Sequence, residues 1–118
     1  YEHEKQHQHQ QPKVHCISSD VTNESSVVSL FQQLQTDFHS DSCDLLVNNP
    51  GTMVPGPTSE LSQKDFDWVM KVNVTGPFLC SREAMKQMSA SQNNNNNNNN
   101  NTTPGGRIIN IGSISSQS

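Results

Sequence analysis

The segment of residues 105–116, GGRIINIGSISS, constrains the fold of this chain more than any other. Its two leading glycines favour a turn, and the isoleucines around Asn110 indicate a buried strand. A cluster of hydroxyl side chains follows where that strand should end. Ligands of open α/β sheets bind outside the carboxyl ends of the strands, which makes Ser113 the first candidate for a chemical role. Taken alone, the hydroxyl cluster after the strand fits an ordinary polar loop better than a catalytic site. The role of Ser113 therefore has to be judged from the other segments of the chain.

Two polar tracts divide the chain. Residues 1–12 consist almost entirely of His, Gln, Glu and Lys, and residues 89–103 are dominated by an unbroken run of asparagine. Such compositions bury too little apolar surface to fold by themselves. We therefore expect a disordered segment at residues 1–12 and a domain at residues 13–118 that carries a low-complexity insertion at 89–103.

Charge and hydropathy exclude several classes of partner. The net charge of −4 comes without a basic cluster, so the chain has no electrostatic footprint for nucleic acid or an anionic membrane. No apolar run approaches the roughly 20 residues that span a bilayer. Residues 1–12 also lack the apolar centre of a signal peptide. We expect a soluble cytoplasmic protein.

The cysteines argue against disulfides and against a metal centre. Cys16, Cys43 and Cys80 are odd in number and widely spaced. This pattern fits reduced thiols better than a disulfide framework or a zinc site. Cys16 and Cys80 lie within apolar patterns, so we expect both to fill the core, and we expect no metal.

The first ordered unit is predicted to be a strand that feeds a helix. Residues 13–20, KVHCISSD, have the β-branched and apolar content of a strand and end at the carboxylate of Asp20. A helix start follows, and apolar residues then recur through residues 27–38 at spacings that draw one stripe on a helix.

A second strand and a second helix are expected next. Residues 44–48 have the continuous apolar centre of a strand that is covered on both faces in a parallel sheet. Asn and Gly in the following NNPG sequence allow a sharp turn or a close approach to a ligand. Ser62-Gln63-Lys64-Asp65 has the capping-box pattern that opens a helix, which should run toward Met88.

Proline interrupts this second helix. Pro77 has no N–H, so it cannot donate to the carbonyl of Asn73 four residues earlier. In a protein interior an ordered water commonly takes over such a bond. Asn73 is therefore either the anchor of a water-mediated relay or only the site of a kink.

The alternation of strands and helices predicts an α/β fold. Short apolar strands joined by helices imply right-handed crossovers and a parallel, Rossmann-type doubly wound sheet with helices on both faces. Polar groups follow all three expected strands, at Asp20, at residues 48–51 and at Ser113. Their convergence at one edge of the sheet favours a binding crevice.

Four motifs in this order resemble those of the short-chain dehydrogenase/reductase family. They are DVT at residues 20–22, LVNNPG at 46–51, VNVTG at 72–76 and GRIINIGS at 106–113. The resemblance implies a Rossmann fold that uses NAD or NADP in the oxidation of CH–OH groups or the reverse reaction.

The resemblance also implies roles for individual residues. Asp20 and Val21 would flank the adenine, and the backbone of Asn49, Pro50 and Gly51 would pass along the cofactor. Three further residues are expected near the reaction centre: Ile111 beside the nicotinamide, Ser113 as the group that orients the substrate oxygen, and Asn73 as the holder of a relay water through its carbonyl.

The chain departs from the family pattern at Pro50, where the family has alanine. Proline removes a backbone donor, so we expect weaker cofactor binding. The family's T-G-x-x-x-G-x-G phosphate loop and its Y-x-x-x-K motif, which would lie before residue 13 and after Ser113, do not occur in the 118 residues. We therefore expect a partial domain that is inactive by itself, whereas a full-length enzyme would be a homo-oligomer.

Other interpretations stay open at this point. The chain could be a non-catalytic truncated paralogue that acts only through protein interaction. Alternatively, it could be a response-regulator-like domain with Asp20 as phosphoacceptor, although the motifs at Asn48 and Ser113 would then be coincidence. The choice between NAD and NADP and the identity of the substrate depend on segments that the sequence does not contain.

Overall fold

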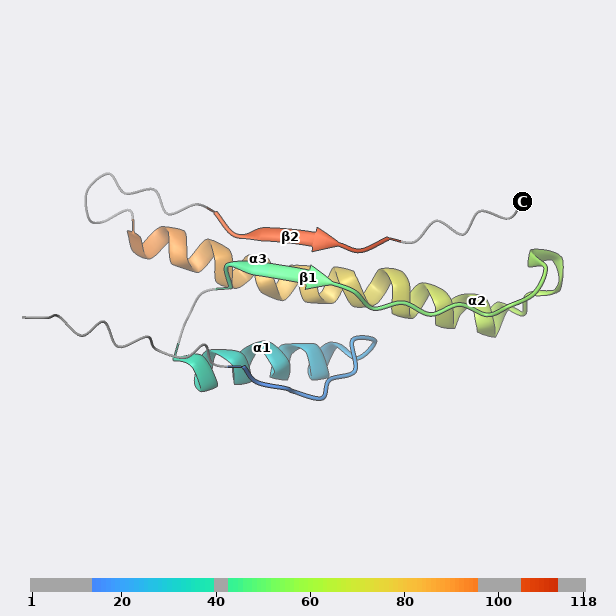
Figure 1. The fold of residues 1–118 in the computed structure, drawn as a ribbon, viewed down its shortest axis with the longest axis horizontal. Helices are drawn as coiled ribbons and strands as arrows, with labels where there is room; N and C mark the ends of the chain where they lie inside the picture. Colours follow the sequence, from blue (N-terminus) through green and yellow to red (C-terminus); the bar gives the residue numbers. More distant parts are fainter. Residues whose placement is uncertain (1–13, 40–42, 96–104, 113–118) are drawn as a thin grey trace, which may run out of the picture.

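The computed structural model describes residues 14–39, 43–95 and 105–112 (Figure 1). Three helices, two strands and two short irregular helical turns follow one another along this part of the chain. In order they are α1 (Glu24–Phe38), β1 (Leu45–Asn48), the 3-10 turn η1 (Thr58–Glu60), α2 (Gln63–Met70), the π-helical turn η2 (Lys71–Thr75), α3 (Gly76–Asn95) and β2 (Arg107–Asn110).

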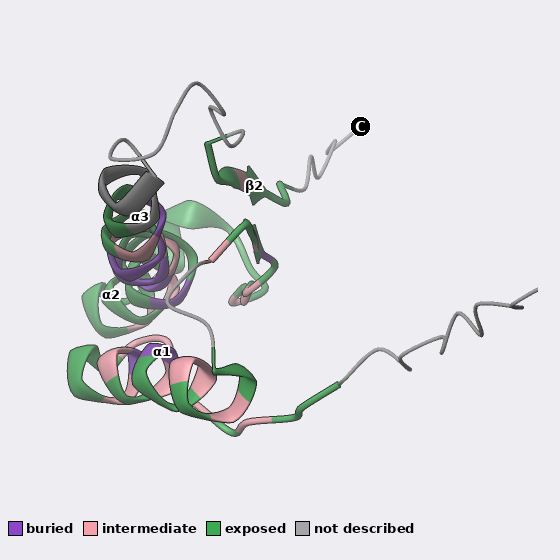
Figure 2. Cartoon of the chain, turned by 90° about the vertical axis from the view of Figure 1, so that its left-hand side faces the viewer, coloured by how far each residue is buried: buried purple, intermediate pink, exposed green. Residues whose placement is uncertain are grey.

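β1 and β2 form a parallel pair, which confirms the α/β class predicted from the sequence. Leu46 lies opposite Ile108 in the register, and both side chains pack against the core. Leu45, Val47 and Ile109 alternate with them and are half exposed. Within the described residues, the helices cover only one face of this sheet, so the expectation of helices on both faces is met on one side alone (Figure 2).

The strand predicted at residues 13–20 is wrong: residues 14–20 contain no strand. A strand needs a neighbouring chain for its backbone hydrogen bonds, and no described segment supplies one. The segment instead lies along α1 and is held by side chains. The Ser19 and Ser26 hydroxyls are 3.1 Å apart, and His15 Nδ1 lies 3.1 Å from a carboxylate oxygen of Asp37.

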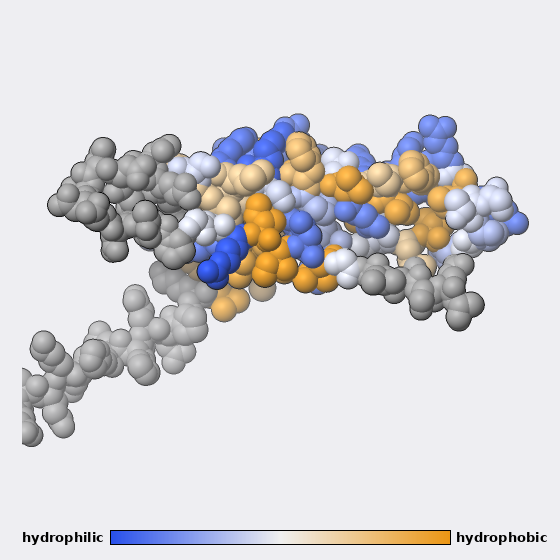
Figure 3. All heavy atoms as spheres, turned by 90° about the horizontal axis from the view of Figure 1, so that it is seen from above, coloured by the Kyte–Doolittle hydropathy of each residue, from blue (hydrophilic) through white to orange (hydrophobic). Residues whose placement is uncertain are grey.

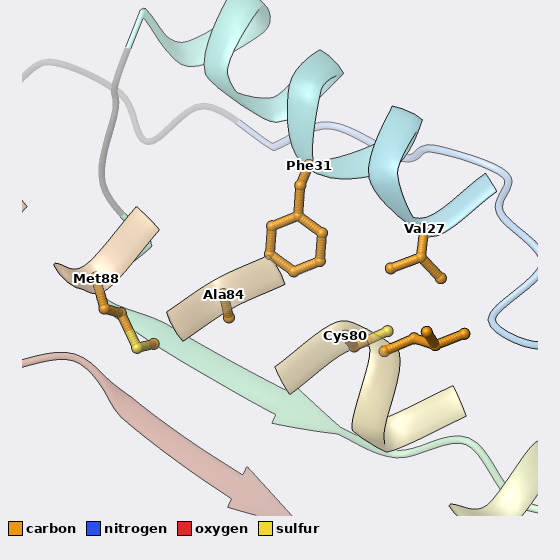
Figure 4. Close-up of a cluster of buried hydrophobic side chains, with 6 residues drawn as sticks. Val27, Phe31, Cys80, Ala84 and Met88 are labelled. Carbon is orange, nitrogen blue, oxygen red and sulfur yellow. The ribbon is translucent and has the colours of Figure 1, made fainter. Parts of the chain in front are cut away.

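The core lies between α1, α3 and the sheet. Figure 4 shows Val27 and Phe31 of α1 pointing towards Cys80 and Ala84 of α3. Leu46 and Ile108 pack on the same cluster from the strands. Burial of such side chains is the main stabilising contribution to folding.

The two cysteine predictions have different outcomes. Cys80 is buried in the core as expected, and burial raises the pKa of its thiol. Cys16 is exposed, so the prediction that it fills the core is wrong. The reason is that residues 14–20 do not join a sheet and therefore have no second layer to cover them.

Both predicted helix starts are confirmed. The Asn23 side chain accepts a hydrogen bond from the Ser26 N–H at the beginning of α1. Ser62 caps α2 by accepting from the Asp65 N–H, and its hydroxyl donates to the Asp65 carboxylate at 2.7 Å. These bonds satisfy N–H groups that have no partner within the first helical turn.

The helix that begins after Ser62 is continuous through α2, η2 and α3, with its irregularity just before Pro77. In the π-helical turn the N–H of Gly76 donates to the carbonyl of Lys71, five residues earlier. Such a turn accommodates a proline because it shifts the hydrogen-bond pattern locally.

α3 continues to Asn95, beyond the end expected near Met88. A helix that is already nucleated propagates through residues of modest propensity such as asparagine. The rest of the expected insertion at residues 89–103 and the expected disordered segment at residues 1–12 lie outside the described residues. None of the helices in the described part is long and apolar enough to cross a membrane.

Candidate functional site

The carboxyl ends of β1 and β2 border a hollow of about 600 Å³. β1 ends at Asn48 and β2 at Asn110, and the N–H of the next residue, Ile111, donates to the Asn48 carbonyl at 2.9 Å. The residues that line the hollow are Asn49, Pro50, Gly51, Thr52, Met53, Asn73, Ile111 and Gly112. The strand pair and η2 together thus gather five of the residues singled out from the sequence: Asn49, Pro50, Gly51, Asn73 and Ile111.

Asn73 lies on η2 and holds the loop that follows β1. Its Oδ1 accepts from the Thr52 N–H at 2.8 Å, and its Nδ2 donates to the Thr52 carbonyl at 2.9 Å. Both hydrogen-bonding groups of the Thr52 main chain are therefore bound by one side chain. Sequence analysis assigned a role to the Asn73 carbonyl and missed this role of its side chain.

Gly51 and Pro50 leave the loop open towards the hollow. No atom lies within 4 Å of the position that a Cβ on Gly51 would take, so the backbone is accessible there. Pro50 offers no N–H on the same stretch of chain.

A second polar cluster lies between the strand ends and α3. Asn48 is buried, with 4% of its surface exposed. Its Nδ2 donates to Asn110 Oδ1 at 2.8 Å and to Ser81 Oγ at 3.0 Å. These three side chains border a hollow of about 350 Å³ that also reaches Asn73 and Ile111. The cluster therefore joins both strand ends to the second turn of α3.

Sequence analysis did not assign a role to Asn48, Ser81 or Asn110. The available signal was that Asn48 and Asn110 each occupy the last position of a short apolar strand. Parallel pairing in register places two such residues side by side, as it does here. Ser81 had no comparable signal, because its partner lies 33 residues away in sequence.

Asp20 and Val21 do not line the hollow of about 600 Å³. Asp20 Oδ1 accepts from the Thr22 N–H at 2.9 Å and from the Thr22 hydroxyl at 2.8 Å. These bonds, together with the positive charge of Lys71, lower the pKa of the Asp20 carboxyl. Val21 packs against Gly76, the first residue of α3.

The turn η2 is therefore close to both segments that are predicted to bind the cofactor, residues 20–21 and residues 49–51. Its Asn73 binds the loop after β1, and Gly76 directly after it contacts the turn at Val21. Ser113, the predicted substrate-orienting residue, lies outside the described residues.

A comparison with protein-family models identifies the chain. The model described as short chain dehydrogenase matches residues 2–118. The chain belongs to this family. The resemblance inferred from the motifs is therefore confirmed, and with it a Rossmann-like fold of which this short-chain dehydrogenase segment contains two adjacent parallel strands.

Related proteins are considerably longer than this segment. An uncharacterized oxidoreductase of Escherichia coli, YgfF, is 33% identical over 106 residues, which cover 89% of this chain and 38% of the relative. A short-chain dehydrogenase/reductase from Serratia marcescens has 32% identity and a TM-score of 0.63, over 82% of this chain and 33% of the other. The protein ElxO, solved with NADP bound, has 28% identity and the same TM-score, over 80% and 33% of the two chains. The chain thus spans little more than a third of these relatives.

Proposed function

We propose that the protein carrying this segment is an NAD(P)-dependent oxidoreductase that interconverts an alcohol and a carbonyl compound. The observation that carries the proposal is the hollow at the strand ends, which gathers Asn49, Pro50, Gly51, Asn73 and Ile111 in one place. Membership of the short-chain dehydrogenase family and a relative solved with NADP support the same conclusion.

The residues around the hollow are suited to one half of a dinucleotide. The accessible backbone at Gly51 allows close approach of a ribose or a nicotinamide ring. Ile111 supplies an apolar surface beside it and is half exposed. Asp20 and Val21, which do not line the hollow, would take the adenine.

The proposed chemistry divides between coenzyme and protein. A nicotinamide coenzyme held by the loop of residues 49–51 and by Ile111 would supply hydride transfer at the substrate carbon. Ser113, three residues after the end of β2, orients the substrate oxygen by a hydrogen bond. The Asn73 carbonyl, which receives no bond from Pro77, holds a water that passes protons to and from the site.

We also propose that the full-length protein is a homo-oligomer that uses the helix formed by α2, η2 and α3. Apolar side chains recur along this helix at intervals of four or seven residues and are 40–59% exposed: Phe66, Met70, Val74, Phe78 and Met85. Seen from the β2 side, apolar residues are exposed through the middle of the molecule (Figure 3). Exposed apolar surface of this kind is typical of protein interfaces.

Coenzyme binding to the full-length protein tests the proposed function. We expect the fluorescence of NADH or NADPH to change on binding, and the bound coenzyme to be oxidised when a carbonyl substrate from a panel is added. The Gly51→Val variant, whose side chain would project into the hollow, should bind more weakly. If the folded protein binds neither coenzyme, the proposal is wrong and the non-catalytic interpretation gains support.

A further inference from the structure

Gly76 lies where the chain leaves almost no room for a side chain. It is buried, and a Cβ at this position would lie 2.9 Å from Val21 Cγ2 and 3.2 Å from Val21 Cβ. The Val21 carbonyl oxygen would be 3.4 Å away. Because Cβ atoms essentially never approach another atom within 3.0 Å, a residue other than glycine requires either Val21 or the helix backbone at position 76 to shift.

Val21 cannot easily move away from a side chain at position 76. Its β-branched side chain has few alternative rotamers, so relief of the contact requires movement of the turn itself. That turn is internally bonded through the Asp20 carboxylate, which accepts from both the N–H and the hydroxyl of Thr22. The turn is also bonded to α1, because the Asp20 N–H donates to Ser26 Oγ at 2.9 Å. Displacement of Val21 therefore displaces Asp20 as well.

Helix propensity alone disfavours glycine at this position. Glycine within a continuous helix is less stable than alanine because it loses more backbone freedom on folding. Gly76 follows η2 directly and continues into α3, so it bears this cost. The contact with Val21 supplies the physical reason for a residue without a side chain.

We propose that Gly76 is a positioning residue that sets the place of Asp20 and Val21 in the adenine half of the coenzyme site. The inference rests on the proposed function and adds a residue that does not itself touch the coenzyme. The nicotinamide half of the site depends instead on the bond between Asn73 and Thr52. A substitution at Gly76 should therefore affect the two halves of the coenzyme differently.

The test compares two half-coenzymes in the full-length protein. Dissociation constants for 5′-AMP and for nicotinamide mononucleotide are measured for the wild type, Gly76→Ala and the control Thr75→Ala, which changes an exposed residue of the same turn. We expect Gly76→Ala to weaken AMP binding about tenfold, because the displaced turn no longer holds Asp20 and Val21 in place against the adenine. The dissociation constant of nicotinamide mononucleotide for Gly76→Ala should stay close to wild type. Both dissociation constants of Thr75→Ala should also stay close to wild type.

A double variant tests whether the contact between the side chain at position 76 and Val21 causes the loss of AMP binding. In Gly76→Ala/Val21→Ala the two Cγ methyl groups of Val21 are absent, so AMP binding should recover to the level of Val21→Ala alone, which sets the cost of losing the Val21 side chain beside the adenine. If Gly76→Ala fails to fold, this double variant must fold and bind AMP for the inference to stand. Equal losses for both half-coenzymes, or no recovery in the double variant, would overturn the inference. A wild-type protein that binds no coenzyme would instead disprove the proposed function.

Discussion

The Asn73 side chain binds both the N–H and the carbonyl of Thr52, at 2.8 Å and 2.9 Å. The two residues belong to different elements, η2 and the loop after β1, and are 21 positions apart in sequence. This pair of bonds determines where the loop of residues 49–52 lies relative to the end of β2. It therefore supports the hollow in which we propose that coenzyme binds.

Replacement of Asn73 by alanine should loosen this loop. Two hydrogen bonds are lost, so we expect the free energy of unfolding of the full-length protein to fall by about 1–3 kcal/mol and coenzyme binding to weaken. Urea denaturation and fluorescence titration measure the two effects. Thr52→Ala is the matched control, because the main-chain N–H and carbonyl of residue 52 that bind Asn73 are kept in this variant. The stability of Thr52→Ala should therefore stay near wild type. Equal losses in both variants would contradict this account.

The cluster of Asn48, Ser81 and Asn110, in which Asn48 is buried, should contribute to stability. In Ser81→Ala the Asn48 amide keeps its bond to Asn110 and loses one of its two partners. We expect a loss of about 0.5–1.5 kcal/mol in the free energy of unfolding. Ser89→Ala makes the same change at an exposed position of α3 and should have little effect. The idea fails if urea denaturation gives the two variants the same stability.

The Asp20 carboxyl should titrate below its ordinary pKa, because Thr22 donates two hydrogen bonds to its charged form. A lowered pKa in the folded state means that the carboxylate stabilises the fold above the pKa of the unfolded chain. This contribution is lost as the pH falls through the lowered value.

Thr22→Val tests this account of Asp20 because it removes the hydroxyl donor and keeps the backbone donor. The pKa of Asp20, followed by NMR, should then rise towards its ordinary value. Thr36→Val removes a hydroxyl that bonds to Gln32 on α1 and should leave that pKa unchanged. An unaltered titration of Asp20 in Thr22→Val would show that the hydroxyl bond is not the cause.

Pro50 should weaken coenzyme binding, because it removes a backbone donor beside the hollow. We expect Pro50→Ala to restore that N–H and to lower the coenzyme dissociation constant about fivefold, the value of one hydrogen bond. Pro55→Ala, an exposed proline of the same loop, should have no such effect. An unchanged dissociation constant in Pro50→Ala would disprove this prediction.

Elements that depend on nearby residues could be predicted from the sequence. The caps at Asn23 and Ser62 were found where their patterns lie, as were the two strands ending at Asn48 and Asn110. Pro77 correctly indicated an irregular turn, although not its π-helical form. The family motifs located the loop of residues 49–51, which does line the hollow.

Contacts between distant residues could not be predicted in the same way. Residues 14–20 have the composition of a strand and remain unpaired, because pairing depends on a neighbour rather than on composition. The bond between Asn48 and Asn110 joins positions 62 residues apart. Ser81 acquires its partner only through the packing of α3 on β1.

The sequence by itself therefore determined the helices, the strands of the parallel pair and the membership of the family, because periodicity, caps and motifs act over a few residues. Only the tertiary structure decided that Asn73 binds Thr52 and that Gly76 meets Val21. Those contacts depend on where the continuous helix through η2 lies relative to the neighbouring segments and on the register of two strands. Such geometry arises only when all of these elements pack together.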